Sequence, residues 1–342
     1  MSKVNIDTMI QINSETNQPK YRQIIDAVED AIQRGTVAHG QQLPSISELA
    51  DGQQIARVTV AKAYEDLRQR GVIIAQHGKG FYVASTVVRS ALNVFVLFDT
   101  LNAYKETVYD ALRQSLPADA RVSLFFHHYN RDLFDSLVRD SIGRYTYYVV
   151  MPHVEGDVSE TVSLIPTDKL LLIDQDIPAL PGEFAAVYQP FETDTYTALV
   201  AGLDRIRQYH RLTLVLPEEP FQYVPGSIVA GFKRFGREHG VPCVVAETYS
   251  DQLIWPGEAY LLIADRDLIR FIKHTDRKGW QPGQEVGLIS YDDTPMKEIL
   301  KGGITVISTD FAEMGRTAGR LISERLHIKI ANPGGLILRN SL

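Results

Sequence analysis

The sequence predicts a mixed α/β protein, with a small N-terminal helical unit followed by a larger, doubly wound α/β part. Up to residue 84, apolar residues recur at helical spacing, and two short apolar runs flank a glycine-rich basic loop. After residue 92, short apolar runs alternate with amphipathic stretches, which is typical of β-α-β units and a mostly parallel sheet. A chain of 342 residues has room for two or three domains of ordinary size.

Composition places the chain among ordinary globular proteins. Hydrophobic residues make up 44% and charged residues 23% of the sequence. No apolar run reaches the length that a membrane span needs, and no signal peptide opens the chain, so we expect a cytoplasmic protein without membrane contact. The single cysteine, Cys243, excludes a disulfide framework within the chain.

Residues 43–83 carry the most informative pattern. Ser45 can accept a hydrogen bond from a free backbone N–H group, and Glu48 three residues later completes a capping box, so a helix is expected to start here. A second helix is predicted from Arg57 to Arg70, and Gly71 ends it. Its core-facing residues are Val60, Ala63, Tyr64 and Leu67.

A hairpin is expected after this second helix, because two short apolar runs, 72–74 and 81–83, flank the basic segment 76–80. Helix, turn, helix and hairpin in this order predict a winged helix-turn-helix. The second helix of such a unit lies in the major groove of DNA, where its N-terminal residues meet base edges or phosphates.

Arg57 offers a planar fork for guanine or phosphate, and Lys79, between two glycines, can approach the backbone or the minor groove. The net charge of −7 argues weakly against nucleic-acid binding, but a local patch decides the attraction to phosphate. The candidate DNA-binding residues are Ser45, Ser47, Arg57, Thr59, Lys62, Lys79 and Gly80. The alternative is a helical unit with a hairpin that binds a protein partner.

The segment from Pro19 to Val83 resembles the DNA-binding domain of GntR-family bacterial transcription regulators. The matching residues are Pro19, Tyr21, Gln23, Ile24, Gly35, Gly40, Leu43, Pro44, Ser45, Leu49, Ala50, Arg57, Thr59, Val60, Ala63, Tyr64, Leu67, Gly71, Gly78, Lys79, Gly80 and Phe81. Three positions depart from the family. Ser47 stands where an arginine is frequent, Gln54 where the turn usually has glycine, and Ala56 where serine or threonine caps the second helix. The loss of the arginine removes one base or phosphate contact, so the operator sequences of relatives do not carry over to this chain.

The larger part is expected to contain alternating strands and helices. The predicted strands are 93–98, 121–127, 147–151, 169–173, 211–216, 243–246, 259–263, 286–290, 304–308 and 336–338. The predicted helices are 104–116, 132–142, 192–209, 225–239, 265–278 and 312–326. The alternation restarts near residue 192, which favours two doubly wound lobes over one large sheet. We therefore expect a DNA-binding domain at 1–84, a linker at 85–91, and a two-lobed domain at 92–342.

The segments 285–295 and 304–318 resemble the effector domain of LacI-family repressors, which have the fold of type I periplasmic sugar-binding proteins. The resemblance is weak from residue 92 onward and clear from about Val286. A GntR-type domain joined to a LacI-type domain is an architecture of sugar-responsive regulators. The resemblance implies a small-molecule effector, most simply a sugar, and a homodimer whose two winged helices read the halves of a near-palindromic operator.

Ligands of open α/β sheets bind at the carboxyl ends of the strands, where this sequence places polar side chains. The candidate effector-binding residues are Asp99, Asn102, Tyr104, Lys105, Asp174, Phe221, Tyr223, Asp265, Asp292 and Phe311. By resemblance, Asp174, Asp265 and Asp292 stand where the family places sugar-contacting groups, and Phe311 matches a pocket position. The alternative for each carboxylate is a helix cap or a surface turn.

One departure concerns the ligand. Sugar-binding relatives usually carry an arginine just before the Ala-Gly-Phe that stands here at 230–232, and this chain has Ile228 and Val229 there. Either Lys105 or Arg266 takes the role of the arginine, or the ligand is not a simple pyranose.

No catalytic residue, metal site or cofactor is predicted. His127 and His128 are adjacent on an expected strand and would point to opposite faces, so one metal ion could not take both. The sequence has no phosphate-binding loop and no Gly-x-Ser-x-Gly motif. We therefore expect a DNA-binding regulator rather than an enzyme. The alternatives are a sensor whose N-terminal domain binds a protein and a regulator with a non-sugar effector.

Overall fold

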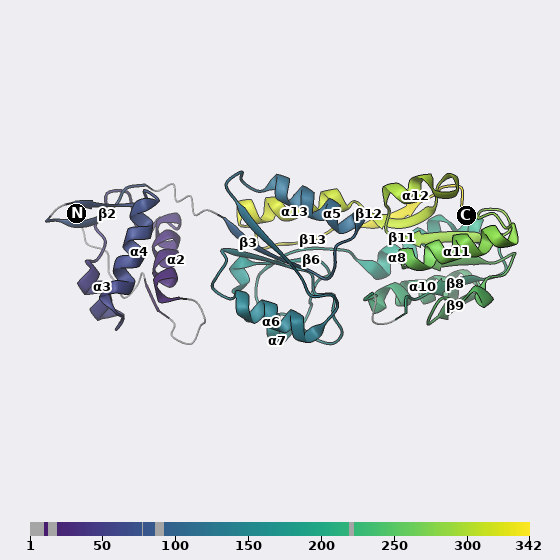
Figure 1. Ribbon diagram of the computed structural model, residues 1–342, viewed down its shortest axis with the longest axis horizontal. Helices are drawn as coiled ribbons and strands as arrows, with labels where there is room; N and C mark the ends of the chain where they lie inside the picture. The colour runs from purple at the N-terminus through teal and green to yellow at the C-terminus, as the bar shows by residue number, and fades with distance from the viewer. Residues whose placement is uncertain (1–9, 13–18, 77, 86–91, 219–221) are drawn as a thin grey trace. The chain divides into compact units, whose positions relative to one another are not determined.

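The computed structural model describes residues 10–12, 19–76, 78–85, 92–218 and 222–342 (Figure 1). The chain divides into two compact units. The first unit comprises Met1–Val94, Asp119–Arg121 and Arg139–Thr146, and the second comprises Phe95–Ala118, Val122–Val138 and Tyr147–Leu342. Of the expected linker 85–91, residues 86–91 lie outside the described residues, so the domain boundaries stay a prediction. None of the described helices combines the length and the apolar character that a membrane crossing requires.

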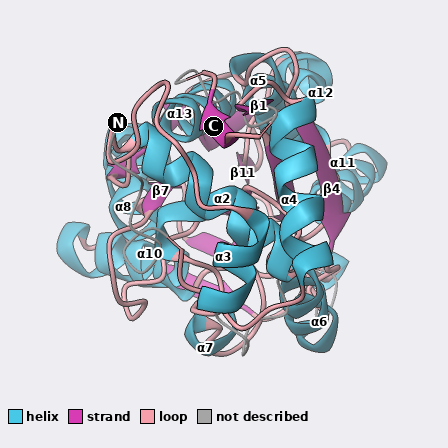
Figure 2. Cartoon of the chain, turned by 90° about the vertical axis from the view of Figure 1, so that its left-hand side faces the viewer, coloured by secondary structure: helices cyan, strands magenta, loops and turns pink. Residues whose placement is uncertain are grey.

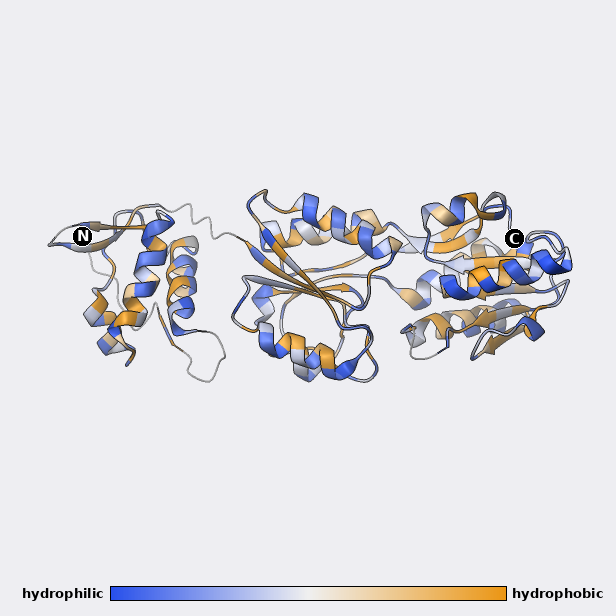
Figure 3. Ribbon diagram, in the orientation of Figure 1, coloured by the Kyte–Doolittle hydropathy of each residue, from blue (hydrophilic) through white to orange (hydrophobic). Residues whose placement is uncertain are grey.

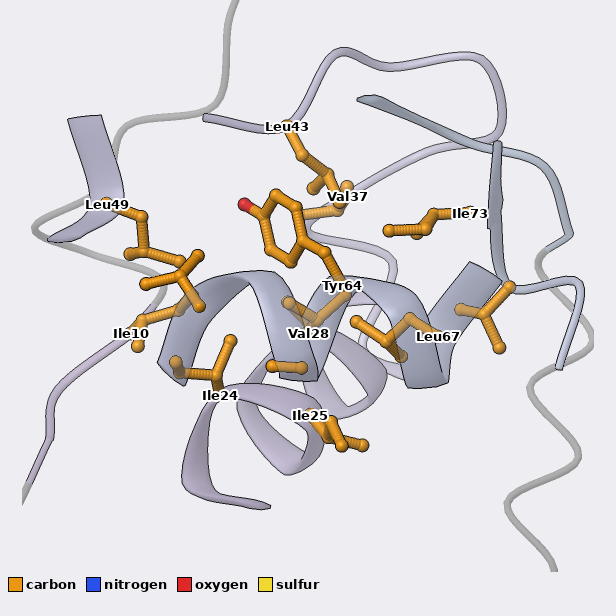
Figure 4. Packing of buried hydrophobic residues seen from close by; sticks show 14 of the residues in the cluster. Ile10, Ile24, Ile25, Val28, Val37, Leu43, Leu49, Tyr64, Leu67 and Ile73 are labelled. Atoms are coloured by element: carbon orange, nitrogen blue, oxygen red, sulfur yellow. The ribbon is translucent and has the colours of Figure 1, made fainter. Parts of the chain in front are cut away.

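The N-terminal elements form a winged helix-turn-helix, as the sequence predicts. They are α2 (Lys20–Gln33), α3 (Ile46–Gly52), α4 (Arg57–Gln69), β1 (Ile73–Gln76) and β2 (Gly80–Val83). Helix α4 packs against both α2 and α3 (Figure 2). The two strands pair antiparallel, with Ile73 opposite Val83. The four core positions predicted for the second helix are all buried. In the core, Tyr64 lies among aliphatic side chains of α2 and the hairpin, and its hydroxyl donates to the Pro44 carbonyl oxygen at 2.9 Å (Figure 4).

The two helix starts differ in their capping. At α3 the predicted capping box is present: the Glu48 N–H donates to Ser45 Oγ at 3.2 Å, and the Ser45 N–H donates to Glu48 Oε2 at 2.8 Å. At α4 the Ala56 side chain makes no cap hydrogen bond. The turn between them holds Gln54 at a φ of 51°, a left-handed conformation that glycine adopts without steric penalty. This left-handed conformation explains why family members usually have glycine at the position of Gln54.

The remaining described residues form two lobes, each built on a six-stranded sheet. The first lobe has strand order β13-β7-β6-β5-β3-β4, and its strands are β3 (Asn93–Phe98), β4 (Arg121–Phe126), β5 (Tyr147–Val150), β6 (Leu170–Asp174), β7 (Ala185–Tyr188) and β13 (Lys329–Ala331). Its helices are α5 (Ala103–Ser115), α6 (Arg131–Ser141), α7 (Ser159–Val162) and α13 (Phe311–Glu324). The pairs β5–β6, β6–β7 and β7–β13 are parallel.

The second lobe has strand order β14-β12-β11-β10-β8-β9. Its strands are β8 (Leu212–Val215), β9 (Cys243–Ala246), β10 (Ala259–Leu262), β11 (Gly287–Tyr291), β12 (Thr305–Thr309) and β14 (Gly334–Ile337). Its helices are α8 (Phe191–Ala201), α9 (Leu203–Ile206), α10 (Gly226–His239), α11 (Asp265–Lys278) and α12 (Pro295–Ile299). In this sheet β14 runs antiparallel to β12, and the other four neighbouring strand pairs are parallel. The strands are mostly apolar and the helices carry hydrophilic outer faces (Figure 3).

Helix α13 belongs to the first lobe although it follows β12 of the second. It packs against α5, β6 and β7. A Cβ atom at Gly315 would collide with the Val108 carbonyl oxygen, so the close approach of α13 to α5 requires glycine. The chain then adds β13 to the first sheet and returns to the second sheet with β14. Two lobes were predicted, but this exchange was not, and neither were β7 and β13.

One predicted helix was wrong in its length. The sequence pattern predicts a single helix over 192–209, and the structure has α8 ending at Ala201 and the short α9 after it. Gly202 separates them, which is consistent with the low helix propensity of glycine. A Cβ atom at Gly202 would lie 3.0 Å from Leu336 Cδ2 of β14, so the absence of a side chain at this position also lets the strand pack closely.

Candidate functional site

The N-terminal part of α4 is accessible to a ligand. Arg57, Val58 and Lys62 are exposed there, and Thr59 is half-buried. The Lys62 ammonium lies 3.9 Å from the centroid of the Tyr21 ring, which holds the lysine beside α2. Because Ala56 leaves the first N–H groups of α4 without a side-chain cap, this turn presents cations and free donors together.

The other candidate DNA-binding residues lie at the start of α3 and at the hairpin tip. Ser45 and Ser47 are exposed, and the Ser45 hydroxyl is engaged in the capping box. At the tip, the Lys79 carbonyl oxygen accepts hydrogen bonds from Gln42 Nε2 at 2.7 Å and from the Tyr82 hydroxyl at 3.2 Å. Gly80 has a φ of 107°, so the tip needs a glycine, and the Lys79 side chain is exposed beside it.

The two-lobed part contains a hollow of about 330 Å³, which we call the outer hollow. Loops after strands of both sheets line it, through Asn102, Tyr104, Asp265, Arg266 and Asp292 among others. An adjoining inner hollow of about 30 Å³ shares Tyr104 and Asp292 with it. The inner hollow is also lined by Asp99, Lys105, His153, Asp174 and Tyr223. Together they make a cleft between the two lobes, large enough in its outer part for a small ligand.

A buried charge network forms the first-lobe wall of the inner hollow. Asp99 and Lys105, both 1% exposed, form an ion pair. The His153 ring connects two carboxylates, with Nδ1 at 2.8 Å from Asp99 Oδ2 and Nε2 at 3.3 Å from Asp174 Oδ2. Gln189 Nε2 donates to Asp174 Oδ1 at 2.5 Å. Burial opposes the ionisation of Asp99, but the hydrogen bond from His153 and the charge of Lys105 outweigh it and hold the pKa of Asp99 well below its usual range.

The second-lobe wall is built around Asp292. Its φ is 60°, and Asp174, at the end of the matching third strand of the first sheet, has a φ of 71°. A left-handed backbone is unfavourable for a residue with a side chain. It recurs at functional sites, where it can direct a side chain in a way that a regular strand cannot. Lys297 Nζ fixes this turn by donating to the Tyr291 and Asp292 carbonyl oxygens at 2.6 and 2.7 Å.

The carboxyl groups of Asp265 and Asp292 have different surroundings. Asp265 pairs with Lys297 at 2.7 Å. For Asp292, no hydrogen-bond donor to the carboxyl group is found among the described residues. Loss of hydration in the cleft raises the pKa of Asp292 to about 7, although the charge of Lys297 opposes the shift. A ligand in the cleft could therefore form a hydrogen bond with the Asp292 carboxyl group.

Aromatic rings complete the cleft. Tyr104 stacks on Phe311 with ring centroids 4.4 Å apart and planes at 26°. Tyr223, from the second lobe, stacks on His153 at 5.5 Å and 23°. Phe311 thus supports Tyr104 from behind and lines neither hollow. Phe221, which the sequence also suggested, lies outside the described residues.

Comparison with known families identifies two parts of the chain. Residues 20–83 match the model of the gntR family of bacterial regulatory proteins, and residues 206–341 match a periplasmic binding protein-like domain. The chain joins a gntR-type domain to a periplasmic-binding-protein-like domain. Over 76 residues the gntR-type domain is 37% identical to the HTH-type transcriptional repressor YtrA of Bacillus subtilis. That match covers 22% of this chain and 58% of the repressor.

Solved structures agree with the fold of the periplasmic-binding-protein-like domain. A LacI family transcriptional regulator from Silicibacter pomeroyi superposes with a TM-score of 0.62 at 21% identity, covering 73% of this chain and 98% of the regulator. A periplasmic binding protein/LacI transcriptional regulator from Alkaliphilus metalliredigens, complexed with D-xylulofuranose, gives a TM-score of 0.59 at 12% identity, covering 73% of this chain and 98% of that protein. At these identities the likeness shows the fold.

Of the ten predicted effector-binding residues, eight line the cleft of the periplasmic-binding-protein-like domain. They are Asp99, Asn102, Tyr104, Lys105, Asp174, Tyr223, Asp265 and Asp292. Sequence reasoning missed His153 and Gln189. His153 follows a predicted strand, so the strand-end rule could have found it. Gln189 follows β7, which the sequence pattern did not reveal.

The structure also shows the surroundings of the segment in which sugar-binding relatives have an arginine. Ile228 lines the inner hollow. Lys105 lines the inner hollow and Arg266 the outer one, so both suggested substitutes face the cleft. Within the described ranges, no three His, Cys, Asp or Glu side chains are placed to share a metal ion.

Proposed function

We propose that this protein is a transcription regulator whose gntR-type domain binds operator DNA and whose interlobe cleft binds a small-molecule effector. The observation that carries the proposal is the exposed N-terminal part of α4, with Arg57 and Lys62 at its surface, on a helix-turn-helix whose hairpin exposes Lys79. A recognition helix reads base edges with its N-terminal residues, and cations beside it bind phosphates. The similarity to a repressor named as HTH-type supports the same function.

The effector is proposed to be a sugar. Carboxylates and amides accept and donate hydrogen bonds to hydroxyl groups, and the stacked Tyr104 offers an aromatic face to the C–H surface of a ring. A solved neighbour with the same fold was crystallised with D-xylulofuranose. Sugar-binding relatives have an arginine just before the position of Ala230, and here either Lys105 or Arg266 takes its role or the ligand is not a simple pyranose, so a non-sugar effector is the second candidate.

The proposed regulator acts as a cytoplasmic homodimer on a near-palindromic operator and performs no catalysis. Each gntR-type domain reads one half-site, and the effector changes DNA affinity because it binds one arrangement of the lobes more tightly than another. The alternative function, in which the helix-turn-helix binds a protein partner, predicts that the protein does not bind DNA with sequence specificity.

The test is selection of DNA by the purified full-length protein from a pool of random-sequence duplexes. We expect enrichment of sequences with two related half-sites, bound with a steep dependence on salt because Lys and Arg displace counterions from phosphates. A folded protein that enriches no sequence above the starting pool would exclude operator binding and leave the protein-binding alternative.

A further inference from the structure

An exposed apolar side chain stands in the middle of the proposed DNA-reading surface. Val58, the second residue of α4, is 74% exposed. Ala61, one turn later, shares its side of the helix and is half-buried. Arg57 and Lys62 flank them and are exposed. The N-terminal half of this helix face therefore presents two small apolar side chains between two cations.

The C-terminal half of the same face is different. Arg68 forms a two-pronged ion pair with Glu65 at 2.8 and 2.9 Å, and Gln69 Nε2 donates to the same carboxylate at 3.0 Å. These side chains satisfy one another and leave little net charge for phosphates. Among the described residues of this face, the N-terminal half combines exposed cations with apolar surface, and it is the half that a recognition helix brings to base edges.

We propose that Val58 reads the 5-methyl group of thymine in each half-site and so sets part of the sequence specificity. In the major groove this methyl group is the only apolar feature of a base-pair edge, and small aliphatic side chains recognise it by contact. The inference rests on the proposed DNA binding and names the base that this helix selects. Arg57 and Lys62 would hold the helix in register on neighbouring guanine or phosphate groups.

The distance between Val58 and Ala61 along the helix is suited to contacts with neighbouring base pairs. A helix rises about 1.5 Å per residue, so Val58 and Ala61 stand about 4.5 Å apart along the axis, close to one base-pair step. Val58 can therefore meet one thymine while Ala61 faces the neighbouring pair. Single exposed apolar residues are common on protein surfaces, and the location of Val58 between two cations on the recognition helix distinguishes it from them.

The experiment uses the full-length protein and the duplexes selected from the random pool. Each thymine of a half-site is replaced in turn by deoxyuridine, which removes the methyl group and keeps every hydrogen-bonding group of the base. Binding constants are measured for the wild type and for Val58→Ala. Ile299→Ala, which truncates a 79% exposed side chain on α12 of the second lobe, is the matched control.

We expect at least one thymine at which deoxyuridine weakens wild-type binding about three- to fivefold, the value of one buried methyl group. Val58→Ala should bind the thymine duplex more weakly by a similar factor and should no longer respond to deoxyuridine there, whereas Ile299→Ala should behave as the wild type does. This cycle isolates the pairwise contact from any change in DNA shape.

Two results overturn the inference while leaving operator binding intact: a half-site in which no thymine methyl affects affinity, or a Val58→Ala protein with the wild-type response to deoxyuridine. A failure to enrich any DNA sequence removes the proposed function itself and this inference with it.

Discussion

Replacing Arg57 with alanine should weaken binding to the selected operator by about 5- to 150-fold per half-site, the range for loss of one bidentate contact to a base. The side chain is exposed at the first position of α4, so the substitution should leave the fold unchanged. If Arg57 reads guanine, the specificity ratio between operator and random DNA should fall together with the affinity. Titration of labelled duplexes, with far-UV circular dichroism as a check on folding, measures both.

Two further variants make this result interpretable. Lys79→Ala should weaken binding to all sequences by a similar factor and lower the salt slope by about one, because a hairpin-tip lysine contacts phosphate. Arg68→Ala is the matched control on the same helix, since Arg68 is already paired with Glu65. An Arg57→Ala protein that retains full affinity and specificity would show that α4 is not the recognition helix.

Replacing Lys105 with methionine should lower the free energy of unfolding of the two-lobed domain by about 3–5 kcal/mol, because it leaves a buried carboxylate without its cation. Asp99 and Lys105 are each 1% exposed, and without the lysine the carboxylate would keep its hydrogen bonds with His153 and Thr100 but lose its ammonium partner. Urea unfolding followed by far-UV circular dichroism measures this, because the signal includes the helices and strands of the first lobe, where Asp99 and Lys105 lie.

Two controls separate this charge effect from a packing effect. The double variant Lys105→Met with Asp99→Asn should recover much of the loss, because no buried charge remains unpaired. Lys329→Met removes the partner of Asp176 from a pair that is 37% and 18% exposed, and should lower stability by less than about 1 kcal/mol. A double variant no more stable than Lys105→Met would mean that the lysine acts through packing.

The same pair makes a prediction about pH. The pKa of Asp99 is depressed in the folded state, so its contribution is present above the unfolded-state pKa near 4 and is lost as pH falls through the lower folded-state value. The stability difference between wild type and Lys105→Met should therefore narrow as pH falls below about 4. A difference that stays constant from neutral to acidic pH would contradict this assignment.

Local signals in the sequence were sufficient for the elements of the helix-turn-helix and for most strands. The capping box at Ser45 and Glu48 and the helical spacing from Val60 to Leu67 depend only on neighbours in the chain. The sheet to which a segment belongs is not encoded in this way. Helix α13 follows β12 with ordinary spacing, and its return to the first lobe depends on the contact that Gly315 permits with α5.

In the candidate site, too, the sequence revealed what depends on local position but not what depends on contacts between distant residues. The rule that ligands meet strand ends brought Asp99, Asp174 and Asp292 together before their distances were known. It could not show that Asp99 pairs with Lys105 and hydrogen-bonds with His153, or that the Asp292 carboxyl group lacks a donor among the described residues. These differences arise from side chains on separate strands and from left-handed backbone at Asp174 and Asp292.

The most direct test of the account is the affinity for the selected operator with and without a ligand of the cleft. A thermal-shift screen of mono- and disaccharides, sugar phosphates and nucleosides supplies the ligand, because a molecule that binds only the folded state raises the melting temperature. Saturating ligand should change the operator affinity of the wild type by about 5- to 150-fold. The Asp292→Ala protein should fold, bind operator normally without ligand, and show no such change. A ligand that saturates the cleft and leaves operator affinity unchanged would contradict the central claim.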